Sequence, residues 1–113
     1  MRRRYVPDRG DVVWLVFSPA LRHEQAGRRP AFVVSPAAYN RKVGLALFCP
    51  VTTQEKGYPF EVPLPSGLPV SGVVLSDHVK NLDWKARGAA FACRLPAEAV
   101  AEVLGKLGTL ILP

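Results

Sequence analysis

The stretch EQAGRRPAFVVSP, residues 24–36, brings two arginines to the edge of an apolar run. Arg28 and Arg29 stand directly before the segment from Pro30 to Val34. An arginine beside a buried strand is costly to desolvate unless an anion pairs with it. Its planar fork of N–H donors fits a carboxylate or a phosphate. The sequence therefore predicts an anion site at this junction.

Further polar groups gather in three segments between the apolar runs. These segments are SPALRHEQAGRR (residues 18–29), VTTQEKGYPF (51–60) and SDHVKNLDWKARG (76–88). The first is longer than a hairpin connection needs, and loops of that length are often functional. Together the segments supply the remaining candidate groups, which are His23, Glu24, Gln25, Thr52, Thr53, Lys56 and Asp77.

This set of groups suits chemistry on a phosphodiester of RNA. The chain has no GxSxG, HExxH, Walker loop or dinucleotide fingerprint. RNA carries its own nucleophile, the 2′-OH, so cleavage needs a base, a proton donor for the leaving oxygen and positive charge on the phosphate. Arg29 suits the last task, whereas the base is open among Glu24, Asp77 and His23. Each of these residues also has an ordinary surface or turn role, so composition alone leaves the function undecided.

The positive charge is concentrated in the first part of the chain. Residues 1–42 contain nine Lys and Arg against three Asp and Glu, whereas residues 43–113 contain six of each sign. The whole net charge of +6 therefore lies in the first 42 residues. A basic face suits nucleic acid or an acidic protein partner.

Length and composition predict one globular domain covering residues 1–113, since 49% of the residues are hydrophobic and 21% are charged. No apolar run approaches the about 20 residues that span a bilayer, and no signal peptide is recognised. We therefore expect a cytoplasmic protein without membrane contact. Cys49 and Cys93 lack metal-ligand spacing, so we expect two reduced, buried thiols and neither a metal nor a cofactor.

Short apolar runs separated by glycine and proline predict a mainly β protein. Strands are expected at residues 11–17, 31–35 and 45–51, and shorter strands at 60–64, 72–75 and 86–94. The first three runs do not alternate polar with apolar residues. Both of their faces must therefore be covered, by an opposing sheet wall, by a helix or by a second subunit.

One C-terminal helix is the clearest element of the sequence. Pro96 fits its first turn, and Glu98 complements the helix dipole. Its apolar face is formed by Val100, Val103, Leu104, Leu107 and Ile111. A short helical turn is expected at residues 36–40. The predicted fold is thus β-rich α+β: a small, strongly curved antiparallel sheet or half-open barrel with a short helix and a C-terminal helix.

Several separated motifs resemble the MazF/PemK family of type II toxins, which are sequence-specific, metal-independent endoribonucleases. The motifs are RYVPDRGDVVWLVF, EQAGRRPAFVVSPAAYN, VTTQEKGYPFEV, WKARG and EVLGKLGTLI. The likeness covers almost the whole chain in one order. It implies a PemK-like barrel related to SH3-like folds, a homodimer, and a groove for single-stranded RNA near the dimer interface. It also implies a cognate MazE-like antitoxin whose acidic, flexible C-terminal tail covers that groove.

The resemblance assigns catalytic roles by position in these motifs. Arg29 matches the family's catalytic arginine, and Thr52 matches its catalytic threonine, with Thr53 the hydroxyl beside it. Glu24 matches a loop carboxylate associated with activity. The pair His23–Glu24 and the later Asp77 stand where PemK-type members place a His-Glu pair and an aspartate.

Three positions depart from the family's patterns. Leu75 stands where PemK-type members have an arginine, which favours the MazF arrangement centred on Arg29 and Thr52. Close MazF relatives often carry acidic residues at the positions of Val16 and Ser18, and we expect their absence to alter which bases are read.

The resemblance predicts ribosome-independent cleavage of single-stranded mRNA to 2′,3′-cyclic phosphate and 5′-OH ends, which inhibits translation and growth. Lys56 and Gln25 are expected to position the strand, Phe17 to stack a base and Arg28 to attract RNA. Two alternatives stay open: a CcdB-like toxin that poisons gyrase, and a non-catalytic RNA-binding barrel. A gyrase poison would have no need of the pairing of an arginine with a threonine.

Overall fold

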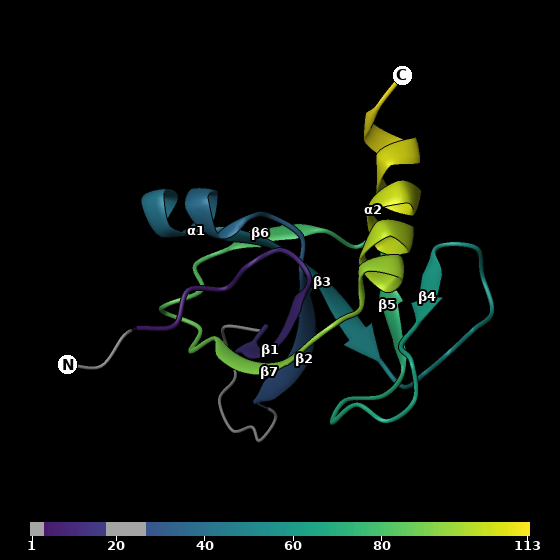
Figure 1. Cartoon of the computed structure of the whole chain (residues 1–113), viewed down its shortest axis with the longest axis horizontal. Coiled ribbons are helices and arrows are strands. Elements are labelled where there is room, and N and C mark those ends of the chain that lie inside the picture. Colours follow the sequence, from purple (N-terminus) through teal and green to yellow (C-terminus); the bar gives the residue numbers. More distant parts are fainter. Residues whose placement is uncertain (1–3, 18–26) are drawn as a thin grey trace.

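A curved, open antiparallel sheet with two helices forms the structure (Figure 1). The computed structural model describes residues 4–17 and 27–113. The strands follow the order β4-β5-β3-β2-β1-β7, and β6 pairs with β3 beside this path. The elements are β1 (Asp11–Val16), β2 (Arg28–Val33), α1 (Ala37–Val43), β3 (Ala46–Thr52), β4 (Glu61–Pro63), β5 (Val73–Leu75), β6 (Lys80–Leu82), β7 (Ala90–Arg94) and α2 (Ala97–Ile111).

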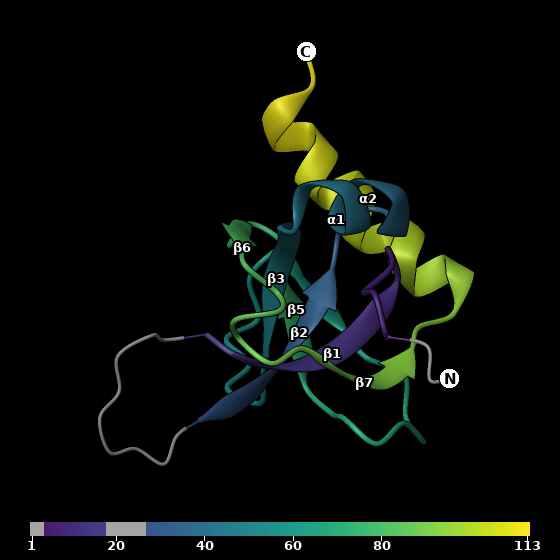
Figure 2. The same ribbon diagram turned by 90° about the vertical axis from the view of Figure 1, so that its left-hand side faces the viewer.

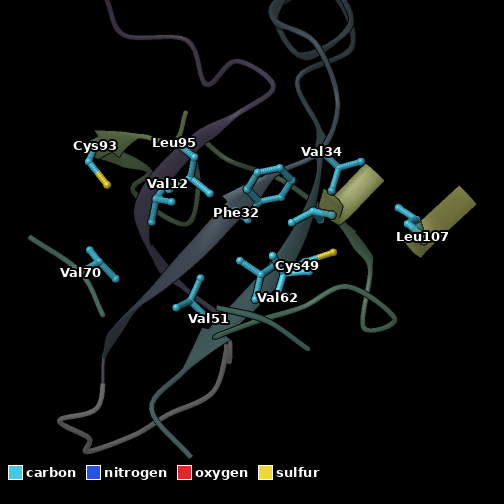
Figure 3. Packing of buried hydrophobic residues seen from close by; sticks show 12 residues of the cluster. Val12, Phe32, Val34, Cys49, Val51, Val62, Val70, Cys93, Leu95 and Leu107 are labelled. Carbon is cyan, nitrogen blue, oxygen red and sulfur yellow. The ribbon is translucent and has the colours of Figure 1, made fainter. Parts of the chain in front are cut away.

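The three central strands bury both of their faces, as their unbroken apolar runs predict. Side chains alternate along a strand, so Phe32 points into one cluster while Ala31 and Val33 point into another. The first cluster has Phe32 in its middle and Leu107 of α2 at its side (Figure 3). The second contains Trp84, whose indole Nε1 donates to the Asn40 carbonyl at 2.9 Å. One sheet therefore separates two small cores.

Helix α2 packs on the first cluster beside β4 and β5 (Figure 1). Val103 and Leu107 are buried, which confirms the predicted apolar face over its first turns. The prediction for Ile111 is wrong, because 69% of that residue is exposed. Helical spacing continues to Ile111, but the last turns of α2 rise clear of the sheet (Figure 1). No helix among the described residues is long and apolar enough to cross a membrane.

Other element boundaries differ from the predictions for local reasons. Helix α1 extends to Val43 and ends at Gly44, whose positive φ of 83° lets its N–H reach the Asn40 carbonyl. Strand β6 was not predicted, because its sequence KNL is short and polar. Residues 86–89 were predicted as strand but form a turn, in which the Arg87 N–H donates to the Asp83 carbonyl at 3.1 Å.

The β2 strand begins three residues earlier than predicted. Arg28 and Arg29 belong to the strand and pair with Val16 and Leu15 of β1. Figure 2 shows this first part of β2 running with the end of β1 away from the two helices. The two arginines are exposed because the strand has left the core at that point. They therefore sit on a rigid element rather than on a loop.

Candidate active site

Strand pairing brings Arg29 and Thr52 together. Strands β2 and β3 are antiparallel, with Ala31 paired to Pro50. The pairing ends there, and Arg29 lies two residues before Ala31, while Thr52 lies two residues after Pro50 at the end of β3. Both residues line one pocket of about 290 Å³, together with Thr53, Gln54 and Ser71.

The Thr52 hydroxyl is oriented by the turn that follows β3. Its Oγ accepts the Gln54 N–H at 3.0 Å, and the Thr53 carbonyl accepts the Glu55 N–H at 3.1 Å. A hydroxyl that accepts one bond still has its own hydrogen to donate. Thr52 is half-buried and Thr53 is exposed. Thr52 can therefore donate a hydrogen bond into the pocket that Arg29 also lines.

A second pocket of about 240 Å³ lies on the other side of Thr52. It shares Thr52 and Gln54 with the first pocket. The remaining lining residues are Lys56, Tyr58, Glu61, Leu75 and His78. The two pockets thus adjoin at Thr52 and Gln54, and each has a cation in its lining, Arg29 in the first pocket and Lys56 in the second.

The loop that carries Lys56 is held by a buried carboxylate. Glu61 is 7% exposed, and its two carboxylate oxygens accept the N–H of Lys56 at 2.9 Å and of Gly57 at 2.7 Å. Hydrogen bonds to an ionised acceptor are stronger than neutral ones. The Lys56 backbone is thereby fixed while its side chain remains exposed in the second pocket.

The structure places Asp77 on the side of the second pocket. Its Oδ1 accepts the Tyr58 hydroxyl at 2.8 Å and lies 3.7 Å from His78 Nε2. The hydrogen bond to Asp77 raises the pKa of Tyr58, because ionisation of the phenol would break that bond next to a carboxylate. Asp77 does not line the pocket of Arg29 and Thr52. In this arrangement Asp77 orients Tyr58.

Arg28 and Phe17, predicted to meet RNA, also have contacts within the protein. The Arg28 Nη2 donates to the Gly88 carbonyl at 3.0 Å. Phe17 is half-buried against the second cluster. The Arg87 Nη1 donates to the carbonyl of Phe17 and, at 3.0 Å, to that of Val16. The turn at residues 83–88 is therefore fastened to the strand ends on both sides of the β1–β2 connection.

Three predicted site residues, His23, Glu24 and Gln25, lie outside the described residues. Across the described part of the chain, no group of three His, Cys, Asp or Glu side chains could hold a metal ion. Cys49 and Cys93 are buried free thiols, as predicted. Burial, and to a smaller extent the Asp77 charge, raises the pKa of Cys49 to about 12, so its thiol is a poor nucleophile at neutral pH.

The pocket also contains residues that sequence reasoning missed. Ser71 and Gln54 line the pocket of Arg29, and Tyr58 lines its neighbour. Ser71 comes from the β4–β5 connection, so only the fold brings it to Thr52. The one sequence signal there is Gly72, since a glycine directly before a strand often marks a close backbone approach.

A family model of the PemK-like, MazF-like toxin of type II toxin–antitoxin systems matches residues 8–111. The chain belongs to this toxin family. It is 50% identical over 111 residues to the endoribonuclease toxin MazF of Escherichia coli strain K12, covering 98% of this chain and 99% of that protein. Both Arg29 and Thr52 lie inside the matched region.

Solved structures of toxins from this family agree with the fold. The crystal structure of MazF from Deinococcus radiodurans is 59% identical, with a TM-score of 0.87 over 96% of this chain and 98% of that one. A MazE–MazF crystal structure from the same organism contains a chain that is 56% identical, with a TM-score of 0.85 over the same shares of the two chains. The predicted toxin family and the predicted open β-rich fold are confirmed.

Proposed function

We propose that this toxin is an endoribonuclease that cuts single-stranded mRNA at short specific sequences, without a ribosome or a metal ion. The observation that carries the proposal is that Arg29 and Thr52 line one pocket. The identity of 50% to an endoribonuclease over nearly the full length supports it. The expected consequence in the cell is inhibition of translation and growth.

The proposed reaction is an attack of the RNA 2′-OH on the adjacent phosphorus. The O2′–P bond forms and the P–O5′ bond breaks, which leaves a 2′,3′-cyclic phosphate and a 5′-OH. Glu24 or His23 takes the proton of the 2′-OH, and a water molecule polarised by Arg29 delivers the proton that the departing O5′ gains. The guanidinium of Arg29 stabilises the negative charge of the phosphorane, and the Thr52 hydroxyl donates to one of its oxygens.

The strand of RNA follows the two pockets past Thr52. Lys56 neutralises a phosphate in the second pocket, and Thr53 contacts the strand beside the scissile bond. Gln25, Arg28 and Phe17 meet RNA near the β1–β2 connection, with Phe17 as the surface on which a base stacks. Tyr58 adds a second aromatic face to the path.

The partners follow from the same proposal. The toxin acts as a homodimer in the cytoplasm and is silenced by a cognate MazE-like antitoxin. The acidic tail of the antitoxin occupies the RNA path, because it supplies carboxylates to the cations that would otherwise bind phosphates. The crystallised MazE–MazF complexes from Deinococcus radiodurans support an antitoxin partner of this kind.

The test is cleavage of a long, defined single-stranded transcript in EDTA, with the cut sites mapped by primer extension. Wild-type protein is expected to cut at a few sites. The Arg29→Ala variant is expected to lose about 10²–10³-fold in kcat, the cost of removing one group that stabilises developing charge. Arg41→Ala, which removes an equal charge from the exposed face of α1, serves as the control and keeps its rate.

Each contrary result would support a different function or mechanism. Cleavage that requires an added metal ion would refute the metal-free mechanism. RNA binding without cleavage, by protein freed of antitoxin, would identify a non-catalytic RNA-binding barrel. Unchanged cleavage by Arg29→Ala with the fold intact would remove Arg29 from the reaction.

A further inference from the structure

Gly72 lies against the backbone of the two threonines in the candidate site. A Cβ added at this glycine would stand 2.3 Å from the Thr52 carbonyl oxygen, 2.8 Å from its carbonyl carbon and 3.2 Å from the Thr53 nitrogen. All three atoms belong to one peptide unit of the main chain. A side-chain rotation cannot relieve such a contact, so an added methyl group must displace either β5 or the Thr52–Thr53 peptide.

The surroundings hold Gly72 in this place from two sides. Its carbonyl accepts the Leu64 N–H at 2.9 Å. The next residue, Val73, is buried and pairs with Thr52 across the β3–β5 ladder. The preceding residue, Ser71, lines the pocket of Arg29 and Thr52. Gly72 is thus the point at which the pocket wall meets the end of β3.

We propose that Gly72 is a positioning residue of the active site. Because Gly72 has no side chain, β5 can pack directly against the Thr52–Thr53 peptide, and this packing directs the Thr52 hydroxyl into the pocket that Arg29 lines. This inference rests on the endoribonuclease activity proposed above. Gly72 touches no reacting atom and acts through Thr52. Any residue other than glycine forces either β5 or the Thr52–Thr53 peptide to move, and either movement changes the position of Thr52 relative to β5 and Ser71.

A matched control exists in the same connection between β4 and β5. Gly67 also has a positive φ, 90° against 118° at Gly72, but a Cβ added there meets no atom within 4 Å. Replacement of either glycine by alanine imposes the strain of a positive φ on a side chain. Only Gly72→Ala adds the collision with the Thr52–Thr53 peptide. The difference between the two variants therefore isolates the contact.

The experiment measures single-turnover and steady-state cleavage of one mapped site in a defined transcript. We expect Gly72→Ala to lower kcat by about 100-fold, as a misplacement of roughly 1 Å in a catalytic group does. KM should change little, since Arg29 and Lys56 still bind the strand. Gly67→Ala should cut at nearly the wild-type rate. Amide NMR spectra should show shifts of Thr52 and Thr53 in Gly72→Ala only.

A double-mutant cycle separates positioning from general loosening of the fold. In a Thr52→Ala background, Gly72→Ala should cause little further loss of kcat, because the group that it misplaces is already gone. A full additional loss in that background would overturn the proposal. So would equal cleavage by Gly72→Ala and Gly67→Ala.

Folding provides a further outcome against the proposal. Gly72→Ala that fails to fold, while Gly67→Ala folds normally, would assign the contact to stability and not to the site. If wild-type protein does not cut RNA at all, the proposed function fails. The amide shifts still decide whether Gly72 positions Thr52, so the two failures are distinguishable.

Discussion

Thr52 and Thr53 are neighbours, yet the structure gives their hydroxyls different environments. Thr52 is half-buried and its hydroxyl accepts the Gln54 N–H, whereas Thr53 is exposed beyond the end of β3. Only the first hydroxyl is both fixed and shared by the two pockets. Of the two neighbouring threonines, Thr52 is therefore better placed than Thr53 for the proposed role of stabilising a phosphorane.

Replacement of Thr52 by valine tests this inequality, because valine keeps the shape and removes the hydroxyl. Thr52→Val is expected to lower kcat by about 10²-fold through the loss of one donor to developing charge. Loss of the bond to Gln54 should cost about 1 kcal/mol of stability, measured by thermal unfolding. Thr53→Val is the control and should affect kcat much less. A larger loss in Thr53→Val than in Thr52→Val would reverse the assignment.

The sequence predicted those residues of the candidate site that lie in local motifs. Arg29 and Thr52 were found because each lies in a recognisable stretch beside an apolar run. Ser71 and Tyr58 were not found, because the β4–β5 connection and the loop before β4 approach Thr52 only through the β3–β5 pairing. Asp77 was predicted near the chemistry, but its hydrogen bond to Tyr58 had no signal in the sequence.

At the scale of elements, the loop between β3 and β4 depends on one carboxylate at the start of β4. Glu61 accepts two backbone N–H groups of the loop and is itself almost fully buried. A glutamine at this position offers one oxygen and an NH₂ group, so one loop amide would face a donor. The loop that presents Lys56 to the RNA path should then lose its fixed shape.

Glu61→Gln is accordingly expected to raise KM for RNA several-fold while kcat changes less, because Lys56 in our proposal binds the strand and does not react. The stability loss should be about 1–3 kcal/mol, the cost of an unsatisfied buried polar group. Glu55→Gln makes the same change of charge at an exposed position of the same loop and should be nearly neutral. Similar KM values in the two variants would show that charge alone matters.

The elements that sequence predicted best are those whose burial dominates their energy. The three central strands read as unbroken apolar runs because clusters lie on both of their faces. Strand β6 was not predicted, because it is formed by pairing with β3 and not by burial of apolar side chains. Ile111 was misassigned because periodicity reports which face of a helix is apolar, while the extent of the sheet decides where that face is covered.

At the scale of the whole molecule, the excess positive charge predicts binding that weakens with salt. The net charge of +6 arises entirely within residues 1–42, and Lys56 adds a cation to the lining of the second pocket. In our proposal, phosphates of RNA and carboxylates of an antitoxin tail compete for the cations that line the two pockets, Arg29 and Lys56. Both ligands should therefore bind less tightly as salt rises, since bound counterions are released.

Binding of a 2′-O-methyl RNA, which lacks the nucleophile, allows this to be measured without cleavage. For Lys56→Ala we expect weaker binding and a log–log salt slope shallower by about 0.7, the change for one phosphate contact on a single strand. Lys42→Ala on α1 is the control and should keep the wild-type slope. An acidic antitoxin peptide should displace the RNA from wild-type protein. Simultaneous binding of both would contradict a shared path.

The two faces of the sheet pack into different hydrophobic clusters, so the register of β2 and β3 determines both the packing of the core and the lining of the candidate site. A slip of one residue between β2 and β3 would turn Phe32 out of its cluster and put Ala31 in its place. The same slip would turn Arg29 to the other face of β2, away from the pocket that it shares with Thr52. A misregistered chain would thus be poorly packed, and our proposal predicts that it would also be inactive. Burial of the Phe32 ring therefore favours the strand register that the candidate site requires, although Phe32 does not line either pocket.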